Sequence, residues 1–264
     1  MSQVLATVSY GGHWEVPPIF EMFEWPAIAF EDTYLAVNRV AILALFAALI
    51  VAVLFLVAFR SPKIVPGKVQ NLCEAVVEFI REQIAFQVIG AEGAGWVPLL
   101  TTIFAFVLVN NWFEVVPLIS FPSTSRMALP AVLTVLVYVL FIGVGIKRHG
   151  ALTYLRTTMF PPGAPKALYV LLGPIELVSN FISRPLTLAI RLFANMLAGH
   201  ILLTLIFVTI HAFLVFGPGL PVGIVALAAA PLMIGFELVV GLLQAYIFTI
   251  LTAVYISSSL EVGH

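Results

Sequence analysis

The chain has 264 residues, of which 62% are hydrophobic and only 9% are charged. Soluble globular proteins carry about 45–50% apolar and ~25% charged residues, so the composition excludes that class and indicates a polytopic membrane protein. The net charge of −1 argues against a nucleic-acid partner. The single cysteine, Cys73, excludes an internal disulfide and gives no metal-site spacing, and we expect neither metal nor cofactor.

The N-terminal part of the chain combines an acidic segment with a first membrane span. Residues 1–38 lack a basic start followed by an apolar core, so they do not resemble a cleavable signal peptide. We expect an irregular segment in water there. Residues 40–59 are apolar throughout and predict a spanning helix. Arg60, Lys63 and Lys68 follow directly, which predicts that this end is cytoplasmic.

Residues 68–89 have the pattern of an amphipathic helix rather than a span. Apolar residues recur at helical spacing, and charged residues occupy the other face. The apolar set is Leu72, Cys73, Val76, Ile80 and Ile84, and the charged set is Glu74, Glu78, Arg81 and Glu82. We expect this helix to lie flat on the cytoplasmic surface of the membrane. Packing against a partner's soluble domain remains an alternative.

Two further spans are predicted at residues 96–119 and 127–146, joined by an external turn at residues 121–126. Asn110, Asn111 and Glu114 lie near the outer end of the first of these spans. Most of the twelve basic residues then fall on the inner side: Arg60, Lys63, Lys68, Arg81, Lys147, Arg148, Arg156 and Lys166. This asymmetry predicts an external N-terminus.

The last part of the chain predicts two helices that are too long to stand upright. A helix over residues 167–216 would be ~75 Å long, whereas the hydrocarbon core is ~30 Å thick. It must therefore be broken, or lie very oblique. Residues 217–221 form a turn, and residues 222–259 again exceed one upright span. We expect a tilted antiparallel hairpin that returns the C-terminus to the cytoplasm, within a single membrane domain of residues 1–264.

Arg191 puts a full positive charge into this apolar sequence. Such a charge costs ~2.5–3.5 kcal/mol at bilayer depth, and arginine cannot lose its proton to escape this cost. At about 100° per residue, Arg184, Thr187 and Asn195 share a stripe with Arg191. We expect this stripe to face water, a carboxylate or a partner. A structural ion pair with a buried acid is the alternative.

Several other polar residues predict a proton path. His200 and Glu237 lie at comparable distances from the turn and are expected to meet across the hairpin. Such a pair can pass protons near neutral pH, although it can equally form a structural hydrogen bond. Gln244 shares a helix face with Glu237. Glu114 is expected to extend the path outward, and Glu176 is expected to line an inner path. Both are otherwise ordinary interfacial acids.

Two segments resemble one known family. Residues 191–199, Arg-Leu-Phe-Ala-Asn-Met-Leu-Ala-Gly, resemble the signature of subunit a of F-type ATP synthases. Residues 243–256 resemble the C-terminal helix of the same family, and the resemblance extends over about residues 40–259. The turn that ends at Arg126 is similar to that of actinobacterial members. The resemblance implies an all-α polytopic fold: one upright N-terminal span, one surface helix, two further spans and a strongly tilted C-terminal hairpin.

The same resemblance implies the partners and the site. The implied partners are the c-subunit ring, the peripheral-stalk b subunits, the rest of the ATP synthase complex and membrane lipid, in a bacterial plasma membrane. Arg191 matches the arginine that meets the ring carboxylates. Further matches are Asn195, Gln244 and Thr187 beside that arginine, Glu114 for the outer half-channel and Glu176, one residue off register, for the inner one. His200 and Glu237 are swapped relative to better-known bacterial members, which is consistent with contact between them.

The implied function is proton translocation that is coupled to ring rotation and ATP synthesis, with no bond-breaking chemistry in this chain. A proton-coupled secondary transporter is the rival, but it predicts two related halves, and the sequence has no such repeat. A structural scaffold is a third reading, and Arg191 argues against it. Sodium is an alternative coupling ion, since ion specificity in this family lies largely in the ring.

Overall fold

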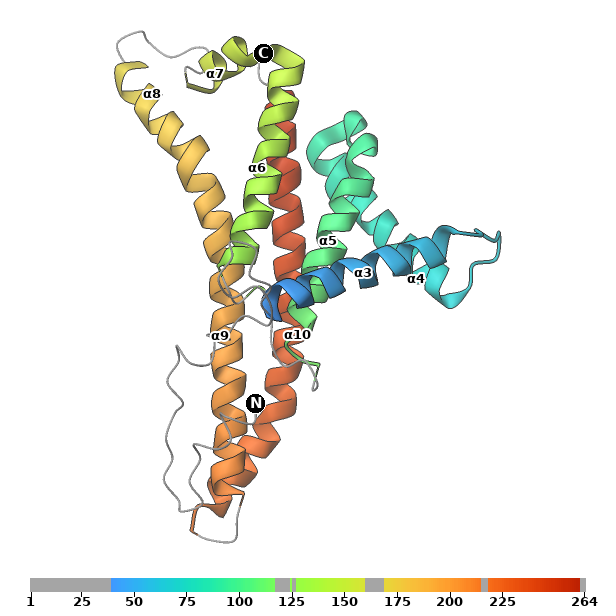
Figure 1. The fold of residues 1–264 in the computed structure, drawn as a ribbon, viewed down its shortest axis with the longest axis vertical. Coiled ribbons are helices and arrows are strands. Elements are labelled where there is room, and N and C mark those ends of the chain that lie inside the picture. The colour runs from blue at the N-terminus through green and yellow to red at the C-terminus, as the bar shows by residue number, and fades with distance from the viewer. Residues whose placement is uncertain (1–38, 117–123, 125–126, 160–168, 215–217, 262–264) are drawn as a thin grey trace, which may run out of the picture. The chain divides into compact units, whose positions relative to one another are not determined.

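The protein is described from a computed structural model, and the description concerns residues 39–116, 124, 127–159, 169–214 and 218–261. Every regular element in these described residues is helical (Figure 1). Five stretches are long and apolar enough to cross a membrane: Val40–Phe59, Lys68–Trp112, Ala128–His149, Leu171–Phe213 and Leu220–Leu260. The protein is therefore an all-helical, multi-pass membrane protein, as its composition indicated. The expected segment at residues 1–38 lies outside the described residues.

The three spans expected from hydropathy at residues 40–59, 96–119 and 127–146 each have a helical counterpart. Helix α3 covers Arg39–Phe59, and helix α6 covers Ala128–His149. Helix α5 covers Val97–Trp112, so it ends earlier than predicted and leaves Glu114 in the turn that follows. Three basic residues end α6, where they complement the negative end of the helix dipole. A short helix, α7, follows at Ala151–Met159 in the loop that the sequence marked only as basic.

The predicted amphipathic segment, residues 68–89, is divided into two pieces, and a third short stretch follows it. Helix α4 covers Lys68–Ile80, a wider π-helical stretch η1 covers Arg81–Ile89, and a tighter stretch η2 covers Gly90–Trp96. Gly90 has a φ of 79°, a conformation that glycine adopts without steric cost, and it ends η1. The expected apolar face is largely buried at Cys73, Ile80 and Ile84, while the expected charged face is mostly exposed. Its position relative to the membrane surface stays a prediction.

The long segment before the hairpin turn is continuously helical and contains one widened turn, and its oblique course stays a prediction. Helix α8 covers Tyr169–Val178, a π-helical turn η4 covers Ser179–Ser183, and helix α9 covers Arg184–Phe213. The backbone N–H of Arg184 bonds to the carbonyl of Ser179, five residues earlier. Pro185 comes next, and its ring has no N–H and would clash with the carbonyl four residues back. The widened turn directly before Pro185 avoids that clash.

Helix α10 covers Leu220–Leu260 without interruption. Its 41 residues correspond to ~62 Å at 1.5 Å per residue, about twice the thickness of the hydrocarbon core. The helix therefore either extends beyond the core or crosses it obliquely, and the strong tilt stays a prediction.

The chain divides into two compact units, and several long helices contribute to both. The first unit contains Met1–Ala47, Leu108–Arg126 and Phe193–Leu243. Its centre is an antiparallel hairpin of α9 and α10, whose ribbons run side by side toward their short connection (Figure 1). Gly223 lies against the backbone of Phe213, and Gly199 lies against the carboxylate of Glu237. These two contacts share one midpoint near residue 218, which fixes the register of the hairpin.

The second unit contains Ala48–Val107, Met127–Leu192 and Gln244–His264. Aromatic rings pack its interior, with centroids 4.9 Å apart for Tyr138 and Phe141 and 5.6 Å apart for Phe141 and Tyr255. The ring of Tyr154 lies on Gly145, where a Cβ atom would overlap it. The Tyr154 hydroxyl is 3.3 Å from the Ser259 hydroxyl, so α7 is joined to the end of α10.

Candidate functional site

Two acids and one imidazole gather inside the first unit. Glu114 follows α5, His200 lies on α9 and Glu237 lies on α10. Nδ1 of His200 is 3.8 Å from Oε1 of Glu114. The two acids are only 5% and 4% exposed, respectively. Two ionised carboxylates buried in an apolar interior would cost several kcal/mol, so the cluster is suited to holding and exchanging protons.

Glycine makes room for one of these acids. The Glu237 carboxylate occupies the space where a side chain at position 199 would begin, so any Cβ there would overlap it. Oε2 of Glu237 is buried and has no hydrogen-bond partner among the described residues. The sequence predicts that His200 and Glu237 face each other across the hairpin. The structure places Glu237 against Gly199, the residue next to His200, and places Glu114 beside the imidazole.

The end of α5 is tied to α10 beside this cluster. The Asn111 side-chain amide donates to the carbonyl of Gly241 at 3.1 Å, and the Trp112 indole donates to the carbonyl of Leu238 at 3.1 Å. The Thr124 hydroxyl donates to Oδ1 of Asn111 at 3.0 Å. The sequence did not single out Trp112 or Thr124, since hydropathy does not reveal which backbone carbonyls a side chain reaches.

The polar stripe of α9 is open to the surroundings. Thr187, Arg191 and Asn195 are exposed, whereas Leu188, Leu192 and Met196 on the other side of the helix are buried. Among the described residues the Arg191 guanidinium has no ion-pair partner. The alternative of a buried structural ion pair therefore gains no support there. Gln244 differs from the stripe because it is only 1% exposed.

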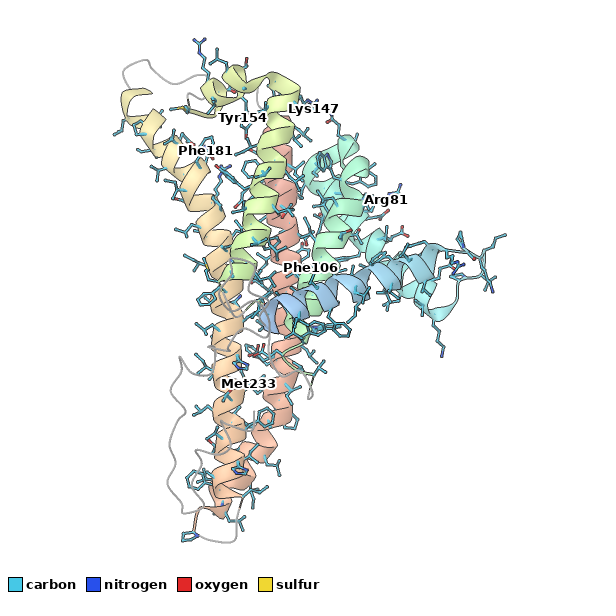
Figure 2. The ribbon with its side chains drawn as sticks, viewed as in Figure 1. Arg81, Phe106, Lys147, Tyr154, Phe181 and Met233 are labelled. Carbon is cyan, nitrogen blue, oxygen red and sulfur yellow. The ribbon has the colours of Figure 1, made fainter. Side chains whose placement is uncertain are left out.

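The second unit contains a partly open polar cavity of about 210 Å³. Residues of α6, α7, α8, η4, α9 and α10 line it, and Figure 2 shows two of them, Tyr154 and Phe181. Its volume far exceeds the ~10–15 Å³ that a single water molecule needs. The Tyr138 hydroxyl and Oδ1 of Asn180 are buried there without a hydrogen-bond partner among the described residues. Water in the cavity would satisfy both groups.

Glu176 and Arg184 both line this cavity. Oε2 of Glu176 accepts a hydrogen bond from the Asn180 side-chain amide at 2.9 Å. The Arg184 guanidinium lies over the Tyr255 ring, 5.8 Å from its centroid. The sequence singled out Glu176 and Arg184 but not Asn180. The Glu176–Asn180 spacing of four residues on one helical face could have indicated that contact.

The candidate residues thus form three groups: the acid–imidazole cluster, the exposed stripe of α9 and the cavity around Glu176. The first group lies in one unit and the cavity lies in the other.

Comparison with known proteins gives consistent matches. The family described as ATP synthase A chain matches residues 40–257, a range that contains every candidate residue. The chain is 46% identical over 246 residues to ATP synthase subunit a of Frankia alni, which covers 93% of this chain and 85% of that relative. It is 39% identical to the same subunit of Rhodococcus erythropolis, over 92% of this chain and 90% of that relative. It is 40% identical to the same subunit of Gluconacetobacter diazotrophicus, over 81% of this chain and 85% of that relative.

Proposed function

This chain belongs to the ATP synthase subunit a family, and from that membership we propose how its polar residues move protons. It is a proton-translocating membrane subunit of an F-type ATP synthase and a part of that complex. In our proposal, two offset aqueous half-channels lead to the carboxylates of a rotating c-subunit ring, and Arg191 separates them. The peripheral-stalk b subunits hold the chain still while the ring turns.

The outer half-channel runs through the acid–imidazole cluster. Protons enter past Glu114 and pass to the pair of His200 and Glu237. The 3.8 Å separation of Glu114 and His200 supports this path, since a small movement or one water molecule closes the gap. From the cluster the proton neutralises a ring carboxylate. The neutral acid then rotates into lipid, which an ionised acid cannot enter without a cost of several kcal/mol.

The inner half-channel begins at the cavity of the second unit. After nearly a full turn of the ring, the acid releases its proton toward Glu176 and the cytoplasm. The polar lining supports this role, because Asn180 and Tyr138 place buried polar atoms there that suit ordered water.

Arg191 carries the proposal. Its guanidinium is exposed in an apolar helix and has no ion-pair partner among the described residues, so it is available to a partner's carboxylate. Its attraction favours the ionised form of a ring acid, and its fixed charge blocks a direct leak between the half-channels. Thr187 and Asn195 flank it on the same exposed stripe. Each proton crossing ~100 mV yields ~2.3 kcal/mol, which the ring converts into torque.

Removal of Arg191 tests the proposal directly. We expect Arg191→Ala to abolish ATP synthesis and ATP-driven proton pumping in membrane vesicles, measured per assembled complex. Arg156→Ala is the matched control, since Arg156 is an exposed arginine of another helix, α7, and it should pump normally. Retained ATP-driven pumping by Arg191→Ala would falsify the assignment.

A further inference from the structure

We propose that Asn111 and Trp112 form a backbone clamp that sets the rotation of α10, and that Asn111 is thereby a positioning residue for proton transfer at Glu237. The proposal rests on the proposed role of Glu237 in the outer half-channel. All the contacts that carry it lie within the first unit.

The clamp uses two successive side chains at the end of α5. The Asn111 amide reaches the carbonyl of Gly241, and the Trp112 indole reaches the carbonyl of Leu238, each at 3.1 Å. These carbonyls are three residues apart, so they lie on one face of α10. A carbonyl oxygen has two lone pairs, so each of these carbonyls can accept a hydrogen bond from a side chain and keep its hydrogen bond within the helix. The two contacts therefore hold α10 without opening it.

Gly241 allows the two helices to come this close. A Cβ atom at this position would lie 3.2 Å from Cβ of Asn111 and 3.4 Å from Cδ1 of Trp112. A larger side chain would push the end of α5 away. Glycine therefore brings the donors within hydrogen-bond range of the backbone.

Thr124 fixes which end of the Asn111 amide faces α10. Its hydroxyl donates to Oδ1 of Asn111 at 3.0 Å, which leaves the nitrogen end directed at Gly241. Both residues are buried, with Thr124 fully so. A rotated amide would direct an oxygen at the Gly241 carbonyl and lose the bond. Thr124 thus orients the donor.

The clamp acts on the proton path because Glu237 directly precedes Leu238. A slip of one residue along α10 would rotate Glu237 by about 100° and shift it by about 1.5 Å. Glu114 follows Trp112 by two residues, so the same clamp places the carboxylate that lies 3.8 Å from His200. Proton transfer needs donor and acceptor within ≈ 2.6–3.2 Å or one bridging water. The described titratable groups of this cluster are Glu114, His200 and Glu237, each from a different segment.

Substitutions in the intact ATP synthase test the clamp. Thr124→Val removes one hydroxyl at nearly constant volume, and Asn111→Asp replaces the donor with an acceptor. A 1 Å misplacement can cost about 100-fold in rate, so we expect proton flux per assembled complex to fall by about tenfold to 100-fold. We also expect the external pH of half-maximal flux to move. Thr124→Ser, which keeps the hydroxyl, should restore both quantities.

The controls separate positioning from loss of structure. Thr102→Val removes a hydroxyl from the exposed side of α5 that bonds only within its own helix, and it should leave flux and pH dependence unchanged. If Asn111→Asp fails to assemble, Thr124→Val decides the question alone. Normal flux per complex with an unchanged pH profile in Thr124→Val overturns the clamp. If Glu237→Gln and Arg191→Ala also leave flux intact, the proposed function itself fails.

Discussion

At the scale of single residues, the acid–imidazole cluster depends on a glycine, Gly199, as much as on its acids. The carboxylate of Glu237 fills the volume in which a Cβ atom of residue 199 would stand. Gly199 therefore sets how near the acid of α10 comes to α9 and to the neighbouring His200. Adding even one methyl group at such a contact displaces the neighbouring side chain, because protein interiors have few voids that could accommodate it.

The first prediction concerns this contact. Gly199→Ala should displace the Glu237 carboxylate and reduce proton flux per complex by at least about tenfold. Glu237→Asp shortens the acid by one methylene and should by itself reduce proton flux. Combined with Gly199→Ala, it should restore part of the flux that Gly199→Ala removes. Flux in reconstituted vesicles measures the two single variants and the double variant. Simple addition of the two losses would show that the residues act independently.

At the scale of elements, residues on the expected apolar face of helix α4 differ in how far they are buried. Ile80 is fully buried near the end of α4, whereas Leu72 on the same expected apolar face is 59% exposed. The neighbouring Phe79 ring packs against Phe104 of α5, with centroids 6.2 Å apart. The pattern agrees with burial at Ile80 but not at Leu72, because it cannot show how much of the face the rest of the unit covers.

The second prediction follows from that difference. Ile80→Ala should destabilise the protein by about 2–5 kcal/mol because it leaves a cavity in a packed interior. Leu72→Ala should cost much less, since that side chain is already exposed. Thermal denaturation of the detergent-solubilised complex compares the two variants. Equal losses of stability would mean that Leu72 is covered by a partner or by lipid to the same degree.

At the scale of the whole molecule, charge distribution predicts how the chain sits in the membrane. The basic loops that follow α3 and α6 predict a cytoplasmic side, which leaves the N-terminus outside and the C-terminus inside. Cys73, the only cysteine, is buried, so an engineered cysteine is not obscured by reaction at the native one.

The third prediction tests this orientation with Ser2→Cys and Gly263→Cys. A membrane-impermeant thiol reagent should label Ser2→Cys in intact cells and Gly263→Cys only in inverted vesicles. The unsubstituted chain should not react in either preparation. The reverse pattern would invert the topology and exchange the outer and inner half-channels of the proposal.

The sequence by itself determined the helical spans, the excessive length of the two helical segments on either side of the hairpin turn, and the identity of Arg191, His200 and Glu237 as costly polar residues. Hydropathy and helical phase are local properties, so short stretches of sequence carry them. Only the tertiary structure decided that Glu114 lies beside His200, that Asn111 reaches Gly241 and that Glu176 borders a cavity. Residues 111 and 241 are separated by 130 positions. Their contact depends on how distant helices rotate and approach, which packing sets and local sequence does not.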